Sequence, residues 1–322
     1  MMDPHLVALL AALVGIPLVL VAYIALVEAI LGRLPARLQG SARPWLWLMP
    51  ALMFALVFLV YPAIYTIALS LFDNAGRPSL ANFTAFLTTD ETLAALRNNG
   101  IWLVLLTAIT VGGGLVFAVL FDRVRYESAA KAVMFMPLAI SFVGAGVIWR
   151  FMLDYRPPGS PQTGTLNALL GSVGIGPVPF LLDPPANTVM LIIVAAWIWT
   201  GFCMVILSAA VKGISRELLD AARVDGASEA QVFRRITLPL LLPAIGVLVI
   251  TMVIASLKAF DIVYVMTNGS FDTEVIANRM YKELFTFNAP GRASAIAVIL
   301  LLLTVPAMFL NLRNVRRQRA FQ

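Results

Sequence analysis

The sequence predicts an all-α integral membrane protein with about seven transmembrane helices. Its 322 residues are 61% hydrophobic and 12% charged, and the mean hydropathy is +0.91. An average soluble domain is about 25% charged, so this chain has too few charged side chains to cover a water-soluble surface. A soluble enzyme, a disordered protein and a disulfide-rich secreted module are therefore excluded. The single cysteine, Cys203, and the single histidine, His5, exclude an intrachain disulfide and most histidine-based metal sites, and we expect no metal in this chain.

Seven apolar runs are long enough to cross a membrane, which takes about 20 residues of helix. Backbone groups inside lipid must bond to one another, so these runs are expected to be helices, and they lack the alternation of barrel strands. The first run has no basic region before it and no small-residue cleavage site after it, which favours a retained helix over a signal peptide. The predicted spans are 6–31, 44–71, 98–121, 130–152, 187–211, 239–260 and 293–312.

The distribution of Lys and Arg predicts the orientation of the chain in the membrane. One set of alternate loops carries 15 of these residues and the other set carries 7. Because loops rich in Lys and Arg stay in the cytoplasm, the first set is expected there, with the N-terminus outside and the C-terminus inside. The cytoplasmic set comprises 32–43, 122–131, 212–238 and the tail from 311.

The segment 212–238 has the pattern of two short amphipathic helices around a glycine corner. Ser215 is placed to cap the first helix, and Gly226 suits a helix end that needs a positive φ. Ser228 and Gln231 have the spacing of a capping box, which predicts the start of the second helix.

The next span is expected to restart at Pro239, because a proline is tolerated in the first turn of a helix. A small amphipathic helix pair on the cytoplasmic face has a shape that fits the groove of a partner protein. An ordinary loop lying against lipid headgroups is the alternative, and the physical pattern alone leaves both open.

The same segment resembles the EAA loop of ATP-binding-cassette importer permeases. The family pattern is Glu-Ala-Ala, three residues, Gly, nine residues and Ile-x-Leu-Pro. In this chain the first acid is Asp in place of Glu, which shortens its reach by one methylene, and all other positions and spacings agree. The matching residues are Asp220, Ala221, Ala222, Gly226, Ile236, Leu238 and Pro239.

Other stretches resemble the maltose-type permeases, the sugar branch of that family. They lie at 47–50, 257–269, 281–285 and 291–295, and the resemblance covers roughly 44–312. It implies the six-helix core of a type I importer with one N-terminal accessory helix. The expected division is 1–43 for that helix and a cytoplasmic linker, and 44–322 for the permease domain with its coupling loop at 212–239. Gly269-Ser270-Phe271 departs from the Gly-Gly-Pro of the family, which leaves the local turn open.

The resemblance also implies partners. The permease pairs with a second permease and two ATP-binding-cassette ATPase subunits, and an extracytoplasmic sugar-binding protein delivers a sugar or oligosaccharide. The chain has no Gly-Lys dipeptide and hence no phosphate-binding loop. ATP and Mg are therefore expected on the partner ATPases, and no cofactor, catalytic residue or nucleic acid is expected here. Asp220 is expected to face a basic group of the ATPase, and the chain is expected in a bacterial or archaeal inner membrane surrounded by lipid.

Four residues in the spans that flank the loop are candidates for the substrate pathway: Trp199, Phe202, Ser256 and Asp261. At about 1.5 Å per residue they fall in the middle or outer half of the membrane, and the resemblance implies sugar contacts there. Aromatic rings would stack on the sugar, and side-chain oxygens would bond its hydroxyls. The alternatives are ring packing for Trp199 and Phe202, a bond from Ser256 to its own helix, and an ion pair of Asp261 with Lys258.

Three other functions are compatible with the residues alone: an ion-coupled secondary transporter, a membrane-embedded transferase and a membrane scaffold. The three glycines at 112–114 are expected to allow close helix packing, with a hinge as the alternative. Glu28, inside the first span, is expected to reach toward Arg33.

Overall fold

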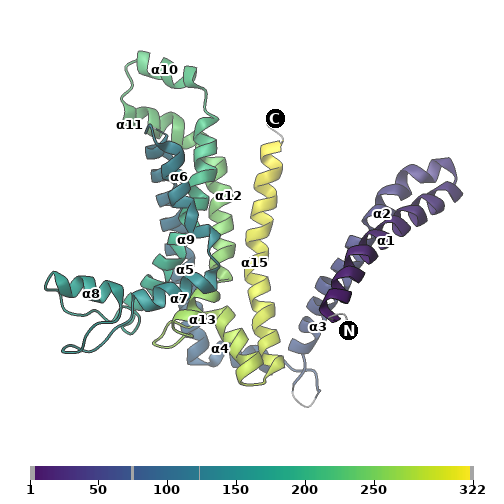
Figure 1. The fold of residues 1–322 in the computed structure, drawn as a ribbon, viewed down its shortest axis with the longest axis horizontal. Helices are drawn as coiled ribbons and strands as arrows, with labels where there is room; N and C mark the ends of the chain where they lie inside the picture. The colour runs from purple at the N-terminus through teal and green to yellow at the C-terminus, as the bar shows by residue number, and fades with distance from the viewer. Residues whose placement is uncertain (1–3, 74–75, 123, 320–322) are drawn as a thin grey trace. The chain divides into compact units, whose positions relative to one another are not determined.

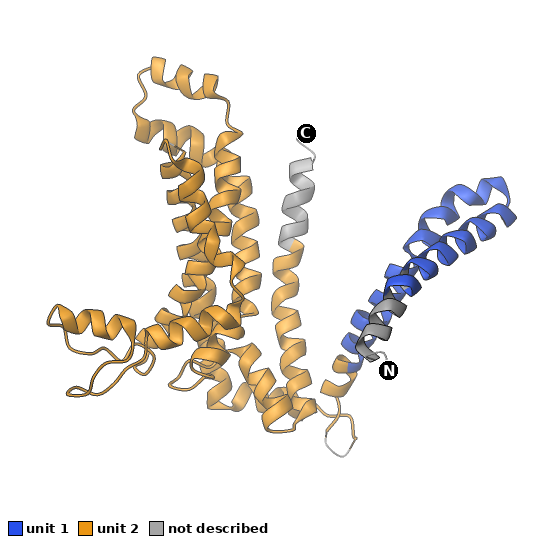
Figure 2. Ribbon diagram, viewed as in Figure 1, with its two compact units in different colours: residues 1–65 blue, residues 66–322 orange. Residues whose placement is uncertain are grey.

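The computed structural model describes residues 4–73, 76–122 and 124–319, and within these ranges the regular structure is helical (Figure 1). Six helices are long and apolar enough to cross a membrane, and a bent helix pair raises the number to seven if it counts as one span. The all-α membrane fold is confirmed. Contacts divide the chain into two compact units, Met1–Tyr65 and Thr66–Gln322 (Figure 2), each of which is described by itself.

The first unit contains a helical hairpin. It is formed by α1 (Pro4–Arg33) and α2 (Ala36–Ala55), and the chain continues through the π-helical turn η1 (Leu56–Val60) into α3 (Tyr61–Ser70). The Tyr23 hydroxyl donates to the Leu46 carbonyl, and the Tyr23 ring meets Trp47 edge-on at 6.3 Å.

Two expectations for this unit are corrected. The predicted linker at 32–43 is helical from Ala36 onward. Pro35 has an extended backbone conformation and occupies the N-cap position, so the helix begins directly after it. Glu28 pairs with Arg43 at 3.1 Å, across the hairpin, and not with Arg33. α2 packs against α1, and contacts divide the chain into compact units after residue 65. The domain division after residue 43 stays a prediction.

The core of the second unit is a bundle of α5 (Asp90–Phe121), α9 (Ala186–Lys212) and α12 (Leu238–Leu257), with α15 (Pro290–Arg319) packed on α12. A Cβ atom on Gly114 would lie 2.7 Å from the Cβ of Cys203, so α5 and α9 approach closely there. Gly112 has no neighbour within 4 Å of such an atom. A Cβ atom on Gly113 would make an ordinary contact with Thr200 at 3.5 Å. Close packing is thus confirmed at Gly114, and Gly113 also faces α9.

The fourth predicted span, 130–152, is broken in the structure. It consists of α6 (Glu127–Phe135), the 3-10 turn η2 (Met136–Ala139) and α7 (Phe142–Met152), which are bent by 98°. Pro137 lacks a backbone N–H, and the Ser141 hydroxyl caps α7 by accepting a bond from the Gly144 N–H at 3.0 Å. The proline and the new helix cap that follows it therefore break the helix that was expected to be straight.

The sixth predicted span begins earlier than expected. α11 (Glu229–Val232), the π-helical turn η3 (Phe233–Thr237) and α12 form one continuous helix from Glu229 to Leu257. The expected restart at Pro239 is wrong, because the wide π turn just before the proline accommodates its ring and its missing N–H. The second loop helix and the span are consequently a single rod.

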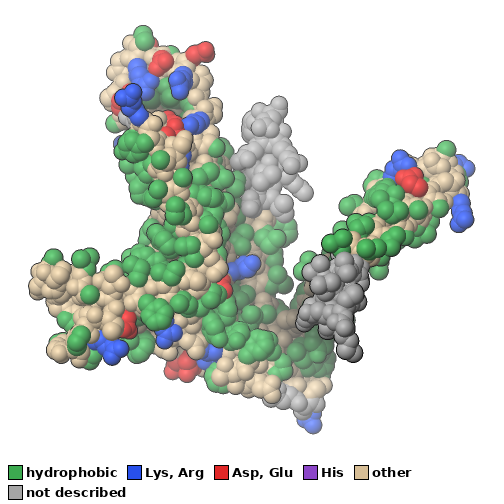
Figure 3. Space-filling view, viewed as in Figure 1, with side chains coloured by type: hydrophobic (Ala, Val, Ile, Leu, Met, Phe, Trp, Pro, Cys, Tyr) green, Lys and Arg blue, Asp and Glu red, His purple; other side chains and the backbone are tan. Residues whose placement is uncertain are grey.

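The remaining helices of the second unit are α4 (Ala81–Thr88), α8 (Thr165–Ser172), α10 (Arg216–Val224), α13 (Asp261–Met266), α14 (Ile276–Tyr281) and the π-helical turn η4 (Lys282–Thr286). Hydrophobic side chains cover most of the visible surface of the bundle, and charged side chains gather over α10 and α11 and around the opposite end (Figure 3). This banding is the surface that a lipid-embedded bundle requires.

Candidate coupling loop and membrane cavity

The turn between α10 and α11 follows the sequence prediction closely. Gly226 has φ +83°, the left-handed conformation that glycine adopts without strain. Ser228 and Gln231 form the predicted capping box: the Ser228 N–H donates to the Gln231 side chain at 2.8 Å, and the Ser228 hydroxyl accepts from the Gln231 N–H. Ser215 occupies the N-cap position of α10 but makes no capping bond, so that detail is corrected. The start of α10 is exposed, which leaves its N–H groups to solvent.

Arg223 links the two loop helices. Its Nη1 lies 2.7 Å from Asp220 Oδ1 on α10, and its Nε lies 2.7 Å from Glu229 Oε1 on α11. Glu229 first and Asp220 second raise the pKa of the Arg223 guanidinium through these bonds. One side chain therefore bridges both helices across the Gly226 corner.

The motif residues fall into two groups according to their exposure. Asp220 keeps 67% of its side chain exposed in spite of its bond to Arg223, and Ala221 and Gly226 are also exposed. Ala222, Ile236 and Leu238 are half-buried, and Pro239 is exposed on the rod. Asp220, Ala221 and Gly226 are therefore accessible to a second protein, while the Ile-x-Leu part belongs to the packing of the rod.

An ion cluster that the sequence reasoning missed ties the loop to the bundle. Glu127, the first residue of α6, pairs with Lys212, the last residue of α9, at 2.6 Å. Glu127 also pairs with Lys131, whose ammonium group in turn contacts the Ser208 hydroxyl. A cavity of about 660 Å³ lies between this cluster and the loop, with Asp220 and Arg223 among its lining residues. The spacing of Glu127 and Lys131, one helical turn, was the signal available in the sequence.

A second cavity, of about 370 Å³, lies within the bundle beside α12. It is lined by aromatic and apolar side chains with a few polar groups, among them Trp102, Phe142, Trp199, Thr251, Lys258, Phe260 and Asp261. The Trp199 ring packs at 5.7 Å against both Phe142 and Phe202. A mostly apolar cavity with a few convergent polar groups is the usual form of a small-molecule site.

The four pathway candidates take different positions. Trp199 and Asp261 line the cavity, and within the described chain no ion pair joins Asp261 to Lys258, which also lines it. Phe202 lies behind Trp199, outside the lining. Ser256 is fully buried, with its Oγ 2.8 Å from the Met252 carbonyl oxygen, which corrects its expected place on the pathway. The bond of Ser256 to its own helix is the alternative that the structure bears out.

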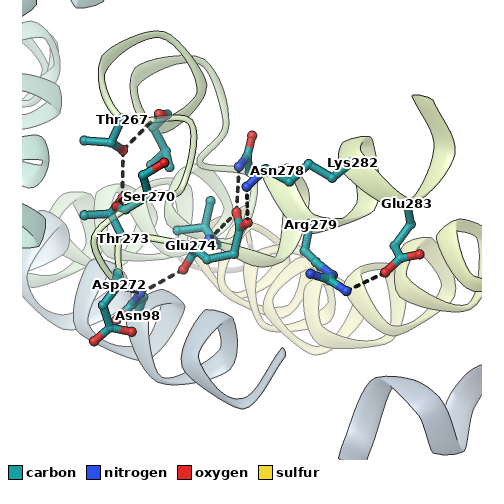
Figure 4. A network of polar contacts seen from close by, with 12 residues as sticks. Asn98, Thr267, Ser270, Asp272, Thr273, Glu274, Asn278, Arg279, Lys282 and Glu283 are labelled. Atoms are coloured by element: carbon teal, nitrogen blue, oxygen red, sulfur yellow. Dashed lines mark hydrogen bonds and ion pairs between the residues drawn. The ribbon is translucent and has the colours of Figure 1, made fainter. Parts of the chain in front are cut away.

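A buried polar network shapes the segment between α13 and α14 (Figure 4). The Asn98 side chain donates to the carbonyls of Asp272 and Glu274, at 2.7 and 2.8 Å. The Glu274 carboxylate bonds Asn278 and Lys282, each at 2.6 Å. These bonds stabilise a turn in which Asn268, Gly269, Phe271 and Asp272 all have positive φ. The sequence did not predict the conformation of this turn. Its backbone is strained, and hydrogen bonds from side chains distant in the sequence stabilise it.

We expect Glu283→Ala to destabilise the protein strongly. Glu283 is 4% exposed and pairs with Arg279 at 2.7 Å and with Arg292 at 2.9 Å. Its removal leaves Arg279, whose side chain is only 15% exposed, without a charge partner, which costs about 3 kcal/mol. The melting temperature of the detergent-purified protein measures the effect. Glu28→Ala, which breaks the exposed pair with Arg43, is the control and is expected to cost less than about 1 kcal/mol. Equal shifts for the two variants would contradict the assignment.

Spans that surround a cavity, with an exposed and preformed helix between two of them, define a multi-span membrane permease component. The chain belongs to the family described as "Binding-protein-dependent transport system inner membrane component", whose model matches residues 110–320. It is thus an inner-membrane protein and the transport component of an ATP-binding-cassette importer, not an enzyme. The expected fold class and family are confirmed, and a secondary transporter, a transferase and a scaffold are excluded.

Two relatives cover most of the chain. It is 50% identical over 275 residues to the osmoprotective compounds uptake permease protein GgtC of Synechocystis, which covers 85% of this chain and 99% of the relative. It is 42% identical over 285 residues to the alpha-glucoside transport system permease protein AglF of Rhizobium meliloti, with 88% and 85% covered. Among solved structures, a bacterial importer of the acidic polysaccharide alginate matches with a TM-score of 0.76 at 23% identity, over 87% of this chain and 97% of that one. That likeness supports the fold.

Proposed function

We propose that the chain imports neutral α-glucosides. In this proposal it works with a second permease and with two ATPase subunits that bind ATP and Mg, and an extracytoplasmic sugar-binding protein delivers the substrate. The N-terminus lies outside and the C-terminus in the cytoplasm, which follows from the distribution of 15 and 7 Lys and Arg between the two sets of loops. The names of the two relatives, an alpha-glucoside permease and an osmoprotectant permease, support this class of substrate.

The observation that carries the proposal is the continuous helix from Glu229 to Leu257. One end lies in the coupling loop beside Arg223, and the other end reaches the cavity at Ile254, Ala255 and Lys258. An ATPase that binds Asp220 and the neighbouring alanines on α10 acts on this rod through the Gly226 corner and the Arg223 bridge to Glu229. The rod then moves as one body, because α11 and the span are one continuous helix. The motion therefore reaches the cavity wall directly, and the cavity opens to one side of the membrane at a time.

The cavity supplies the contacts that a neutral sugar needs. The Trp199 ring offers a stacking face, with Phe142 and Phe202 holding it in place. Asp261 accepts hydrogen bonds from sugar hydroxyls, and Lys258 donates them. One cation and one anion leave the lining without a net charge, which favours a neutral substrate over an acidic one. Ser256 takes no part, because its hydroxyl is buried against α5.

Replacement of Trp199 by Ala tests the proposal. We expect ATP-driven uptake of maltose or sucrose into vesicles to fall at least about tenfold, while Trp199→Phe keeps most of it, because a ring face remains. The matched control is Trp197→Ala, which removes a partly exposed ring that packs on Trp149 and does not line the cavity. Uptake of neither sugar by the assembled complex, or equal loss in both alanine variants, would contradict the proposal.

A further inference from the structure

Four aromatic rings form a continuous group at the end of the bundle opposite the coupling loop. Phe260 and Tyr264 stack at 5.2 Å, and Tyr281 contacts both, at 5.3 and 5.0 Å. Phe285 follows Tyr281 at 4.7 Å. We call Phe260, Tyr264, Tyr281 and Phe285 the aromatic track. Its members come from the start of α13, from α14 and from η4, so two separate segments of the chain bring the rings together.

The track begins at the cavity and ends at the surface. Phe260 lines the cavity beside Asp261. Tyr264 is 38% exposed and Phe285 is 67% exposed, whereas apolar side chains elsewhere in α13 and α14, such as Val263 and Ile276, are buried. The rings therefore do more than fill the core, because Phe285, at the end of the track away from Phe260, is the most exposed of the four. The segment 261–286 also lies outside the helices that cross the membrane.

Ion pairs beside Tyr281 hold the aromatic track in place. Lys282, next to Tyr281, bonds the buried Glu274, and Glu283 pairs with Arg279 (Figure 4). Glu283 also pairs with Arg292 on α15. The hydrogen bond with Tyr264 raises the pKa of Tyr281, so the Tyr281 hydroxyl stays protonated at neutral pH and can donate a hydrogen bond. Rigid rings that also carry donors lose little entropy when they bind a ligand.

The chemistry of these groups fits a sugar. A pyranose ring has apolar C–H faces that stack on aromatic rings and an edge of hydroxyls that bond to phenolic oxygens. Resting on the function proposed above, we propose that the aromatic track is an outer binding subsite for the α-glucoside, which receives the sugar and leads it along its ring faces to the cavity. The occupant is the transported sugar, because the track is continuous with the cavity wall at Phe260.

The test uses single cysteines in the full complex in nanodiscs. Cys203 is buried and reacts slowly, so an introduced cysteine reports its own position. We expect maltose or sucrose to slow the reaction of Phe285→Cys and of Tyr264→Cys with a water-soluble maleimide at least about threefold. The matched control is Phe287→Cys, which replaces an exposed ring that lies over the Arg279 guanidinium at 5.4 Å and outside the track. Its rate is expected to be unchanged by sugar.

A second comparison separates stacking from mere proximity. With Tyr264→Cys as reporter, Phe285→Ala is expected to weaken the protection by sugar, and Phe285→Trp to keep it. Labelling of position 285 only by a lipid-soluble reagent would identify a lipid anchor, and no labelling at all would identify an interface with the second permease. Each of these results overturns the subsite.

The two proposals fail in different ways. If maltose or sucrose is taken up and uptake depends on Trp199, but sugar protects neither position 264 nor position 285, the subsite alone is wrong. If neither sugar is taken up, or Trp199→Ala transports normally, the proposed substrate or its cavity is wrong, whatever the labelling shows.

Discussion

Replacing Asp220 by Lys is expected to reduce ATP-driven uptake at least about 30-fold while the complex still assembles. The change reverses the charge that the proposed function aligns with a basic group of the ATPase, and reversal of such a contact costs about 2 kcal/mol or more. It also places a cation beside Arg223, whose Nη1 lies 2.7 Å from Asp220 Oδ1 in the native loop. The measurement is sugar uptake by reconstituted vesicles, with complex assembly followed by size-exclusion chromatography.

Asp225→Lys is the matched control for this variant. It makes the same charge change five residues further along the same loop, at an exposed position that caps the end of α10. We expect assembly and uptake to remain within about twofold of the native complex. Similar losses in both variants would mean that overall loop charge, and not the contact of Asp220, controls coupling.

Gly201→Ala is expected to destabilise the folded permease by about 3 kcal/mol or more. A Cβ atom on Gly201 of α9 would lie 2.1 Å from the Met134 carbonyl oxygen and 2.8 Å from the Phe135 Cα, so backbone and not a flexible side chain blocks it. α6 must then move away from α9, and overpacking of this kind costs about 1–3 kcal/mol even where side chains can yield. Thermal unfolding of the purified complex and its yield in the membrane fraction measure the loss.

Gly112→Ala makes the same substitution in a span where no atom lies within 4 Å of the new methyl group. Because alanine favours a helix over glycine by about 0.5–1 kcal/mol, this variant is expected to be as stable as the native protein or slightly more stable. It also tests the alternative that 112–114 is a hinge. A stable Gly112→Ala complex that has lost uptake would support the hinge, and normal uptake would remove it.

Local patterns in the sequence were sufficient for the number of spans and for the conformation of the candidate coupling loop at Gly226 and Ser228. Runs of about 20 apolar residues identify spans because every backbone group in lipid must be satisfied within its own helix. The Gly226 corner and the Ser228 capping box were equally predictable, since each depends on a few neighbouring residues. The family pattern from Asp220 to Pro239 added the function, and the match over residues 110–320 confirmed it.

The two errors in the predicted spans occurred at prolines. Pro137 precedes a break of 98°, whereas Pro239 lies inside a continuous rod. The same residue type disrupts one helix and is absorbed in the other, because a π turn precedes Pro239 and a new helix cap at Ser141 follows Pro137. The neighbouring turn and cap, and not the proline alone, therefore distinguish the two cases.

Tertiary structure alone decided which residues meet at the membrane cavity, at the aromatic track and in the polar network around Glu274. Asn98 meets Glu274 across 176 positions of the chain, and Phe260 meets Tyr281 across the turn of α13 and α14. Ser256 and Asp261 are five residues apart, yet one is sealed against α5 and the other lines the cavity. The sequence determined which residues enter the membrane and where the chain turns, since those follow from solvation and local backbone geometry. Which side chains face one another depends on helix rotation and distant contacts, and only the folded bundle sets those.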